Sequence, residues 1–236
     1  MTIVYRTTAM LLFIAGSLMA QAPINTVPNW NGIDFLTSFG VVNTASYGEV
    51  ITVAAGTGPL SNFGFEIGWC TAAVTLRGEV YAWNGTQATG TSLFESGSQV
   101  VPASSAFQLV TFNVPGSGVT LPAGTYILFA TSSKDQTGAV PSACYLGHVN
   151  DSVYPGGSFW YMNNGADATQ WVTPTLLNPW LNIATDLAFQ VNMGATPTPT
   201  PTTTGVPAAS TTSLLLGFAG VIGIGLLGLY RFRLAR

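Results

Sequence analysis

Charged side chains are scarce in this chain: of its 236 residues, six are Lys or Arg and nine are Asp or Glu. Between residues 23 and 205 only Arg77 and Lys134 are basic, while all nine acids lie there, so two positive charges against nine negative ones give a net charge of −7. A surface of this sign repels phosphate backbones, so nucleic acid is excluded as an expected partner. Neutral Ser, Thr, Asn and Gly residues must keep the chain in solution, as in exported proteins.

Histidine and the motifs of hydrolytic enzymes are also nearly absent. His148 is the only histidine, and no Gly-x-Ser-x-Gly nucleophile elbow accompanies it or the nearby Asp151. Two carboxylates about 5–9 Å apart across a cleft can hydrolyse a glycosidic bond, but nine acids spread over a whole domain give little reason to expect such a pair. We predict no catalytic residue, and a polysaccharide-acting hydrolase is the third of the functions considered.

Cysteine is limited to Cys70 and Cys144. Because neither belongs to a C-x-x-C pair, a zinc site is not expected. In an oxidising compartment the two would form one disulfide, closing a loop of about 74 residues and stabilising the fold by about 4 kcal/mol. Two buried free thiols are the alternative.

Long apolar runs occur only at the two ends. Residues 1–22 combine Arg6 with the run Met10–Ala20 and small residues after it, which is typical of a secretory signal cleaved after Ala20 or Ala22. The run is shorter than the ~20 residues of a comfortable membrane span. The alternative is an uncleaved anchor.

The C-terminal segment 214–236 predicts a transmembrane helix with a basic tail. Its apolar part, 214–230, contains no charge and would be about 25 Å long as a helix. Arg231, Arg233 and Arg236 follow it and predict a cytoplasmic C-terminus. Before it, residues 195–213 are rich in Thr and Pro and predict an extended stalk that cannot form a core.

The middle of the chain, 23–194, has the periodicity of β-strands. Val74–Trp83 alternates, with Arg77, Glu79 and Trp83 on the outward face, so Arg77 and Glu79 are expected to pair. Tyr126–Ala130 is apolar on both faces and is expected to be buried on both. About ten short strands separated by turns predict an antiparallel β-sandwich of jelly-roll type. The other predicted strands are Glu49–Ala54, Asn62–Ile67, Ser92–Val101, Phe107–Val114, Ala143–Val149, Ser158–Met162 and Asp186–Asn192, the last with Leu187, Phe189 and Val191 inward.

Aromatic residues supply the candidate ligand site. Trp83, Trp160, Trp171 and Trp180 accompany many Asn, Gly and Ser residues, and flat rings on a sandwich can stack on sugar faces. The alternative is that most of these rings fill the core.

A structural calcium ion is the only cofactor considered. Asp151, Asp167 and Asp186 provide hard oxygen ligands in loop-rich sequence, but the full spacing of a calcium loop is missing. The alternative is ordinary turn formation by Asp, Asn and Gly.

Several stretches resemble the bacterial "choice-of-anchor" surface domains, over roughly Gly48–Val191. The resemblance implies an exported β domain and brings no catalytic residue. The stretches that carry it are Glu79–Gly90, Leu93–Gly97, Leu121–Phe129, Tyr161–Gly165 and Asp186–Phe189.

The tail resembles the sorting signals of bacterial PEP-CTERM proteins. Its short motif would be Val206, Pro207, Ala208, Ala209 and Ser210, followed by the apolar run and the arginines; the Pro-Glu-Pro core itself is absent. The resemblance implies removal of the tail by an exosortase-type membrane protease, and permanent anchoring is the alternative. The sequence thus predicts a non-catalytic, surface-displayed protein of the bacterial envelope or extracellular matrix, structural or adhesive, with a carbohydrate-binding module for extracellular polysaccharide as the alternative.

Overall fold

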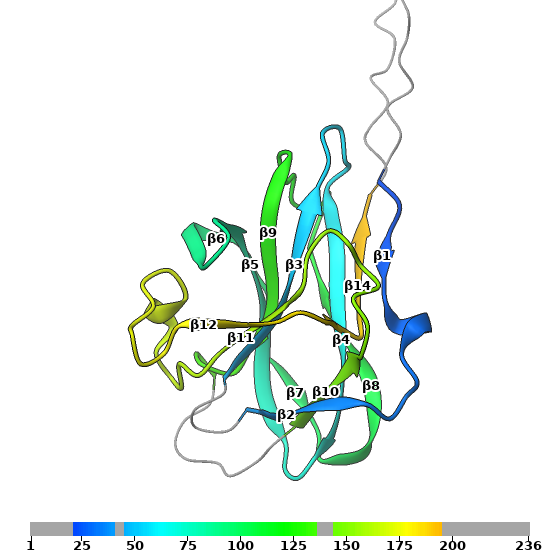
Figure 1. Cartoon of the computed structure of the whole chain (residues 1–236), viewed down its shortest axis with the longest axis vertical. Coiled ribbons are helices and arrows are strands. Elements are labelled where there is room, and N and C mark those ends of the chain that lie inside the picture. The colour runs from blue at the N-terminus through cyan, green and yellow to red at the C-terminus, as the bar shows by residue number, and fades with distance from the viewer. Residues whose placement is uncertain (1–20, 41–44, 136–143, 195–236) are drawn as a thin grey trace, which may run out of the picture. The chain divides into compact units, whose positions relative to one another are not determined.

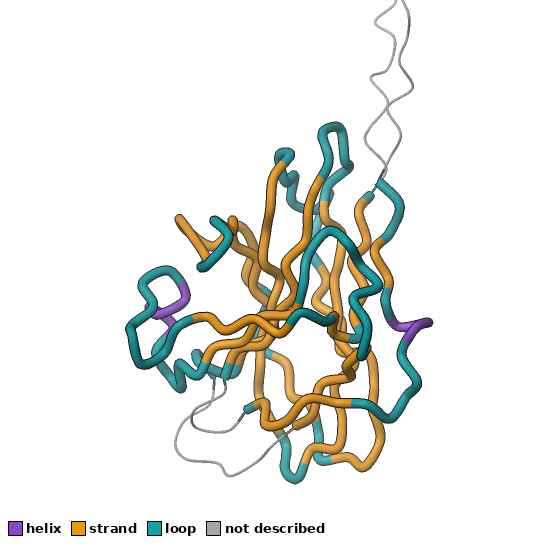
Figure 2. The backbone as a smooth tube through the Cα atoms, viewed as in Figure 1, coloured by secondary structure: helices purple, strands orange, loops and turns teal. Residues whose placement is uncertain are grey.

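Every strand pairing in the described chain is antiparallel, and the strands form two sheets (Figures 1 and 2). The computed structural model describes residues 21–40, 45–135 and 144–194. In these residues the only helical elements are two 3-10 turns, η1 (Val27–Asn29) and η2 (Ala168–Trp171). The predicted all-β sandwich is confirmed. The stalk, the sorting motif, the C-terminal arginines and all but the last two residues of the signal segment lie outside the described residues.

The first sheet is organised around the long strand β4, which pairs with β8 on one side. On its other side β14 pairs with the first half of β4 and β10 with the second half. β1 pairs with β14, so the two ends of the described chain lie side by side (Figure 1). The strands are β1 (Ile24–Asn25), β2 (Phe35–Phe39), β4 (Leu60–Cys70), β8 (Ser104–Asn113), β10 (Cys144–Val149), β13 (Asp186–Leu187) and β14 (Phe189–Met193).

The second sheet has the order β12-β11-β3-β9-β5-β6, with β7 pairing the first part of β5. β9 lies in its interior, between β3 and β5. The strands are β3 (Ser46–Val53), β5 (Val74–Trp83), β6 (Ala88–Glu95), β7 (Gln99–Val101), β9 (Gly124–Thr131), β11 (Phe159–Met162) and β12 (Trp180–Ile183). The predicted strand Ser92–Val101 is therefore two strands, and β1, β2 and β12 were not predicted.

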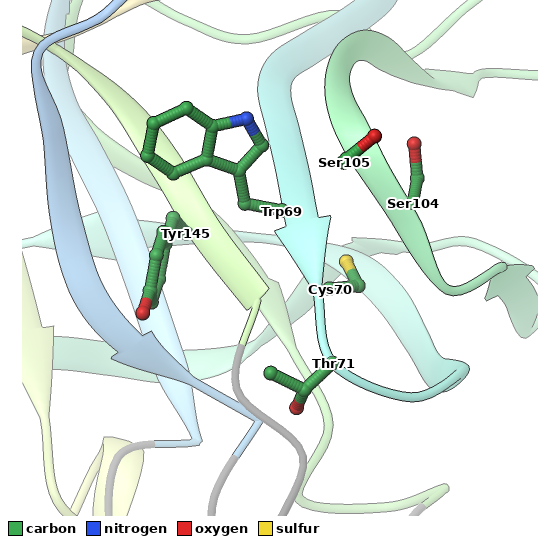
Figure 3. A pocket seen from close by; sticks show the side chains of 6 residues that line it. All are labelled: Trp69, Cys70, Thr71, Ser104, Ser105 and Tyr145. Atoms are coloured by element: carbon green, nitrogen blue, oxygen red, sulfur yellow. The ribbon is translucent and has the colours of Figure 1, made fainter.

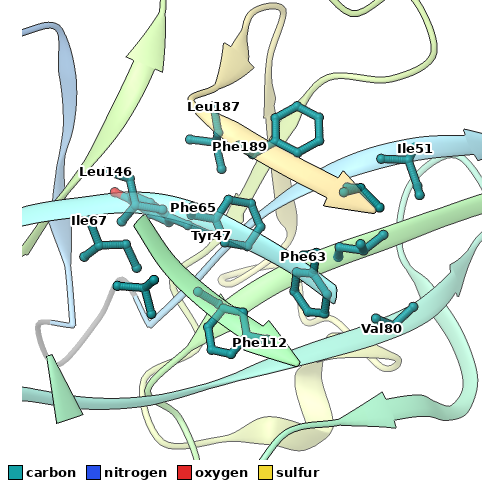
Figure 4. Packing of buried hydrophobic residues seen from close by; sticks show 14 of the residues in the cluster. Tyr47, Ile51, Phe63, Phe65, Ile67, Val80, Phe112, Leu146, Leu187 and Phe189 are labelled. Atoms are coloured by element: carbon teal, nitrogen blue, oxygen red, sulfur yellow. The ribbon is translucent and has the colours of Figure 1, made fainter. Parts of the chain in front are cut away.

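The main core lies between the two sheets (Figure 4). Phe63, Phe65 and Ile67 of β4 alternate inward and are at most 1% exposed. Phe112 of β8 reaches across to the second sheet, where a Cβ on Gly78 would come within 2.4 Å of its ring. Only a glycine at position 78 leaves room for this ring. The inward orientation predicted for Leu187, Phe189 and Val191 is confirmed.

A second, aromatic cluster covers the outer face of the second sheet. Ile127 and Phe129 of β9 pack there against Tyr81 and Trp83 of β5, beneath the segment 163–180. β9 is thus covered on both faces, and Tyr126–Ala130 is buried as predicted. Burying both faces of a strand requires the continuous apolar run that this segment has.

Candidate functional site

Trp69 is the one non-glycine residue with a positive φ, 45°, among the described residues. It lies at a β-bulge, where Ser105 and Ala106 of β8 face this single residue of β4. The alternation that buries Phe65 and Ile67 would bury Trp69 as well, but the bulge reverses it: Trp69 is 38% exposed, and Cys70 turns into the core. A bulge can re-aim a side chain in this way.

Five aromatic rings from five separate segments meet on the outer side of the first sheet. We call this set the aromatic face; its members are Trp30, Phe35, Trp69, Phe107 and Tyr145. Phe35 stacks on Tyr145 at 4.6 Å between ring centroids and meets Trp69 edge-on at 4.8 Å. Trp30 meets Phe107 edge-on at 4.9 Å, and its indole N–H donates to the carbonyl of Asp34 at 2.7 Å.

A surface hollow of about 550 Å³ lies at the Trp69 end of the aromatic face. Figure 3 shows the rings of Trp69 and Tyr145 on one side and the hydroxyls of Ser104 and Ser105 on the other. Cys70 and Thr71 complete the lining. The hollow thus combines two rings with several hydroxyl groups.

The predicted disulfide between Cys70 and Cys144 is confirmed. It joins β4 to β10 next to Trp69 and Tyr145, the two rings of the hollow. Both cysteines are buried, and the bridge ties together the two strands that carry these rings. The alternative of two free thiols is wrong.

The four tryptophans predicted to bind sugar lie elsewhere, in the cluster outside the second sheet. Trp83, Trp171 and Trp180 are at most 8% exposed, and Trp160 packs against Trp83 at 4.8 Å. Trp171 Nε1 donates to Ser46 Oγ at 3.0 Å, and Trp180 Nε1 donates to the carbonyl of Trp171 at 2.9 Å. The solvent-facing orientation predicted for Trp83 is wrong, because the segment 163–180 covers that face. Trp83, Trp171 and Trp180 thus fill a core and expose little ring surface to a sugar, while Trp160 is partly buried against them.

The three aspartates considered for calcium have separate surroundings. Asp167 caps η2 by accepting from Thr169 N at 3.0 Å. Its carboxylate also accepts from the Thr169 hydroxyl and the Gln170 amide, and these hydrogen bonds lower the pKa of Asp167. Asp186 is buried and accepts two backbone N–H groups, whereas Asp151 is exposed. No group of three or more His, Cys, Asp or Glu residues positioned to hold a metal ion occurs in the described part of the chain.

The predicted pairing of Arg77 with Glu79 is wrong, because each has another partner. Arg77 Nε donates to Asp135 Oδ2 at 2.7 Å, and its guanidinium also pairs with Glu95. The hydrogen bonds with Asp135 raise the pKa of Arg77, and the charges of Asp135 and Glu95 raise it further, although burial partly offsets this. Lys134 Nζ donates to Glu79 Oε1 at 2.8 Å and to Glu95 Oε2 at 2.5 Å. Glu79 is fully buried on the covered face, where an unpaired carboxylate would be costly.

Two further carboxyl groups are buried between the sheets. Glu49 Oε2 accepts from Leu187 N at 3.0 Å, and Asp186 Oδ2 accepts from Val153 N and Tyr154 N at 2.7 Å each. The other oxygen of each group has no hydrogen-bond partner among the described residues. Burial raises the pKa of Glu49 well above its ordinary value, and the nearby Asp186 raises it further.

His148 lies near Asp186 and is partly buried. Its Nε2 is hydrogen-bonded to Thr185 Oγ1 at 2.7 Å. Burial lowers the pKa of His148, although the charges of Asp34 and Asp186 partly offset this.

Comparison with known proteins adds no relative: no family model, curated protein or solved structure matches the chain. Among residues 21–40, 45–135 and 144–194 there is no helix of the length and apolarity needed to cross a membrane. The transmembrane helix predicted from the sequence rests on the apolar run 214–230, which lies outside the described residues. Function has to be argued from the aromatic face and the hollow.

Proposed function

We propose that this chain is a non-catalytic adhesive domain displayed on a bacterial surface, and that its aromatic face binds polysaccharide. The observation that carries the proposal is the conformation of Trp69. A bulky residue in the left-handed region costs about 1–2 kcal/mol, and a large ring left in solvent gives up burial energy as well. Strain of this kind concentrates at functional sites.

The chemistry of the hollow suits a sugar. The apolar C–H face of a pyranose packs on a flat ring such as Trp69, while its hydroxyls form hydrogen bonds with polar groups at the rim. Ser105 provides a hydroxyl opposite the rings, and so does Ser104, whose Oγ also donates to the carbonyl of Ala106 and accepts from its N–H. Because the disulfide holds Trp69 and Tyr145 in place, little ordering is needed on binding, which favours affinity.

We also propose where the protein is located, from the composition of its N-terminal and C-terminal segments. Residues 1–22 would direct export, 195–213 would form a stalk, and 214–236 would hold the domain in a membrane until an exosortase-type protease removes the tail. The resemblance to choice-of-anchor domains and the jelly-roll-like connectivity belong to the same proposal. The protein would then act at the cell surface or in the extracellular matrix.

The burial of two neighbouring carboxyl groups, Glu49 and Asp186, is consistent with the non-catalytic part of the proposal. Glu49 and Asp186 are fully buried in the sandwich, so a polysaccharide cannot reach them in this conformation. Hydrolysis by two carboxyl groups requires both to flank a bond in an open cleft.

The test is a binding screen with the full chain, purified with its disulfide intact in a detergent that has no sugar headgroup. The ligands are plant and bacterial polysaccharides and the host's own extracellular polysaccharide. We expect saturable binding that Trp69→Ala weakens by tenfold or more, about the value of one lost stacking interaction. Val100→Ala is the matched control, because Val100 is 64% exposed on β7, in the other sheet. Binding unaffected by Trp69→Ala, or no binding to any polysaccharide, would contradict the proposal and favour a structural role.

A further inference from the structure

Both basic residues in the described part of the chain form ion pairs with acidic residues. Its only two basic residues, Arg77 and Lys134, are paired with Glu79, Glu95 and Asp135 in one cluster on the second sheet. Lys134 also lies over the ring of Trp171, 5.1 Å from its centroid. Neither basic residue contacts the aromatic face. An anionic polymer would therefore have to lie on that face without a counter-charge, close to acidic side chains.

One of these acids, Glu66, adjoins the aromatic face at its Trp30 end. A Cβ built on Gly147 would lie 3.0 Å from both Glu66 Cβ and Trp30 Cε2, so the carboxylate side chain and the indole lie beside each other over this glycine. The Glu66 carboxylate has no hydrogen bond or ion pair with any described residue, and it is only half-buried. Partial burial raises its pKa. Its side chain thus leaves β4 beside the Trp30 indole and carries a hydrogen-bond acceptor without a described partner.

Rings beside a carboxylate can attract two kinds of ligand. A quaternary ammonium group binds to ring faces and is attracted by a nearby carboxylate, whereas a neutral sugar stacks on a ring and donates a hydroxyl hydrogen to the carboxylate. The hollow at the other end of the face distinguishes them, because Ser104 and Ser105 offer hydroxyls that a methylated ammonium group cannot use. The spread of rings from Trp30 to Trp69 also suits a chain with repeating units.

We propose that the aromatic face selects an uncharged polysaccharide, with one sugar on Trp69 in the hollow and another on Trp30, where a sugar hydroxyl donates to the Glu66 carboxylate. This inference rests on the proposed function and specifies its ligand class. Charge selects against anionic polymers, and the hydroxyl groups of the hollow favour a ligand that carries hydroxyls over a methylated ammonium group, which leaves them unused.

The experiment compares matched pairs of polymers on the full chain in the same sugar-free detergent. The pairs are dextran with dextran sulfate, and hydroxyethyl cellulose with carboxymethyl cellulose, together with the neutral polysaccharide that binds best in the screen. We expect each neutral polymer that binds to bind more tightly than its anionic partner at low salt. Glu66→Ala should weaken neutral binding about tenfold, the value of a hydrogen bond to a charged group, and Glu66→Gln, which keeps an acceptor, should weaken it less.

The failures of the two proposals are distinguishable. If an anionic polymer binds as tightly as its neutral partner and Trp69→Ala abolishes both, the ligand class is wrong and the polysaccharide site stands. If choline displaces the bound polymer, the face is a cation site and the ligand class is wrong. If no polymer binds to a correctly folded chain, the proposed function itself fails. Circular dichroism of each variant separates loss of binding from loss of fold, and Glu66→Gln preserves shape if Glu66→Ala does not fold.

Discussion

The buried carboxyl of Glu49 predicts a pH dependence of stability that one substitution can remove. Glu49→Gln preserves the shape of the side chain and an oxygen to accept from Leu187 N. It removes a carboxyl group whose pKa is raised well above the ordinary 4.5 by burial and by the charge of Asp186. The proton is expected on Glu49, because two backbone N–H groups at 2.7 Å already stabilise the charge on Asp186.

The sign of the effect follows from the raised pKa. In the unfolded chain Glu49 loses its proton near pH 4.5, whereas in the folded protein it keeps the proton to higher pH. Stability contributed by this group is therefore fully present below pH 4.5 and is lost as pH rises through the folded-state pKa. One extra bound proton corresponds to about 1.4 kcal/mol for each pH unit in that window. Burial also raises the pKa of Asp186, which acts in the same direction.

The assay is urea unfolding followed by tryptophan fluorescence, between about pH 4 and pH 8, on the full chain in detergent. Near pH 4.5 the two proteins should be about equally stable. At higher pH the wild type should lose up to about 1.4 kcal/mol per pH unit relative to Glu49→Gln, so the variant becomes the more stable protein. Asp151→Asn, at an exposed position, is the control and should follow the wild type. Parallel curves for wild type and Glu49→Gln over the whole range would refute the reasoning.

Three further outcomes are expected. Trp69→Gly should be more stable than Trp69→Ala by about 1 kcal/mol in urea unfolding, because only glycine adopts the positive φ of this position without strain. This is the reverse of the usual order of Gly and Ala in a strand. Equal stabilities of the two variants would show that the backbone relaxes. Reducing the disulfide, which spans 74 residues of sequence, should lower the free energy of unfolding by about 4 kcal/mol and weaken polysaccharide binding. Unchanged binding would show that the bridge does not position the hollow. Neither calcium nor EDTA should shift the melting temperature, because Asp167 and Asp186 are already engaged in separate hydrogen bonds; a rise with calcium would reveal a site that these positions do not explain.

Local patterns in the sequence predicted most strands, because the alternation of apolar and polar residues within a strand shows which of its residues share a face. Val74–Trp83 is β5 with the predicted bounds, and the two-sided apolar run Tyr126–Ala130 is buried on both faces. The alternation of β11 places Phe159 and Tyr161 on one face and Trp160 and Met162 on the other, and the two pairs pack in different clusters. What alternation could not show is what covers the outer face. The segment 163–180 lacks any regular period, yet it buries Trp83 and converts predicted surface rings into a core.

Trp69 escaped prediction for a different reason, since β4, near whose end it lies, has a clear period. Continued from Phe65 and Ile67, that period places Trp69 inside and Cys70 outside. The sequence contained one opposing signal: a cysteine expected to form a disulfide has to face its partner, and Cys144 precedes Leu146, which alternation places in the core. If Cys70 must turn inward to meet Cys144, the residue before it must turn outward, at a site where β8 supplies an extra residue. The disulfide and the exposed Trp69 are thus two consequences of one bulge, and the aromatic face could have been located by combining the cysteine pairing with the strand period.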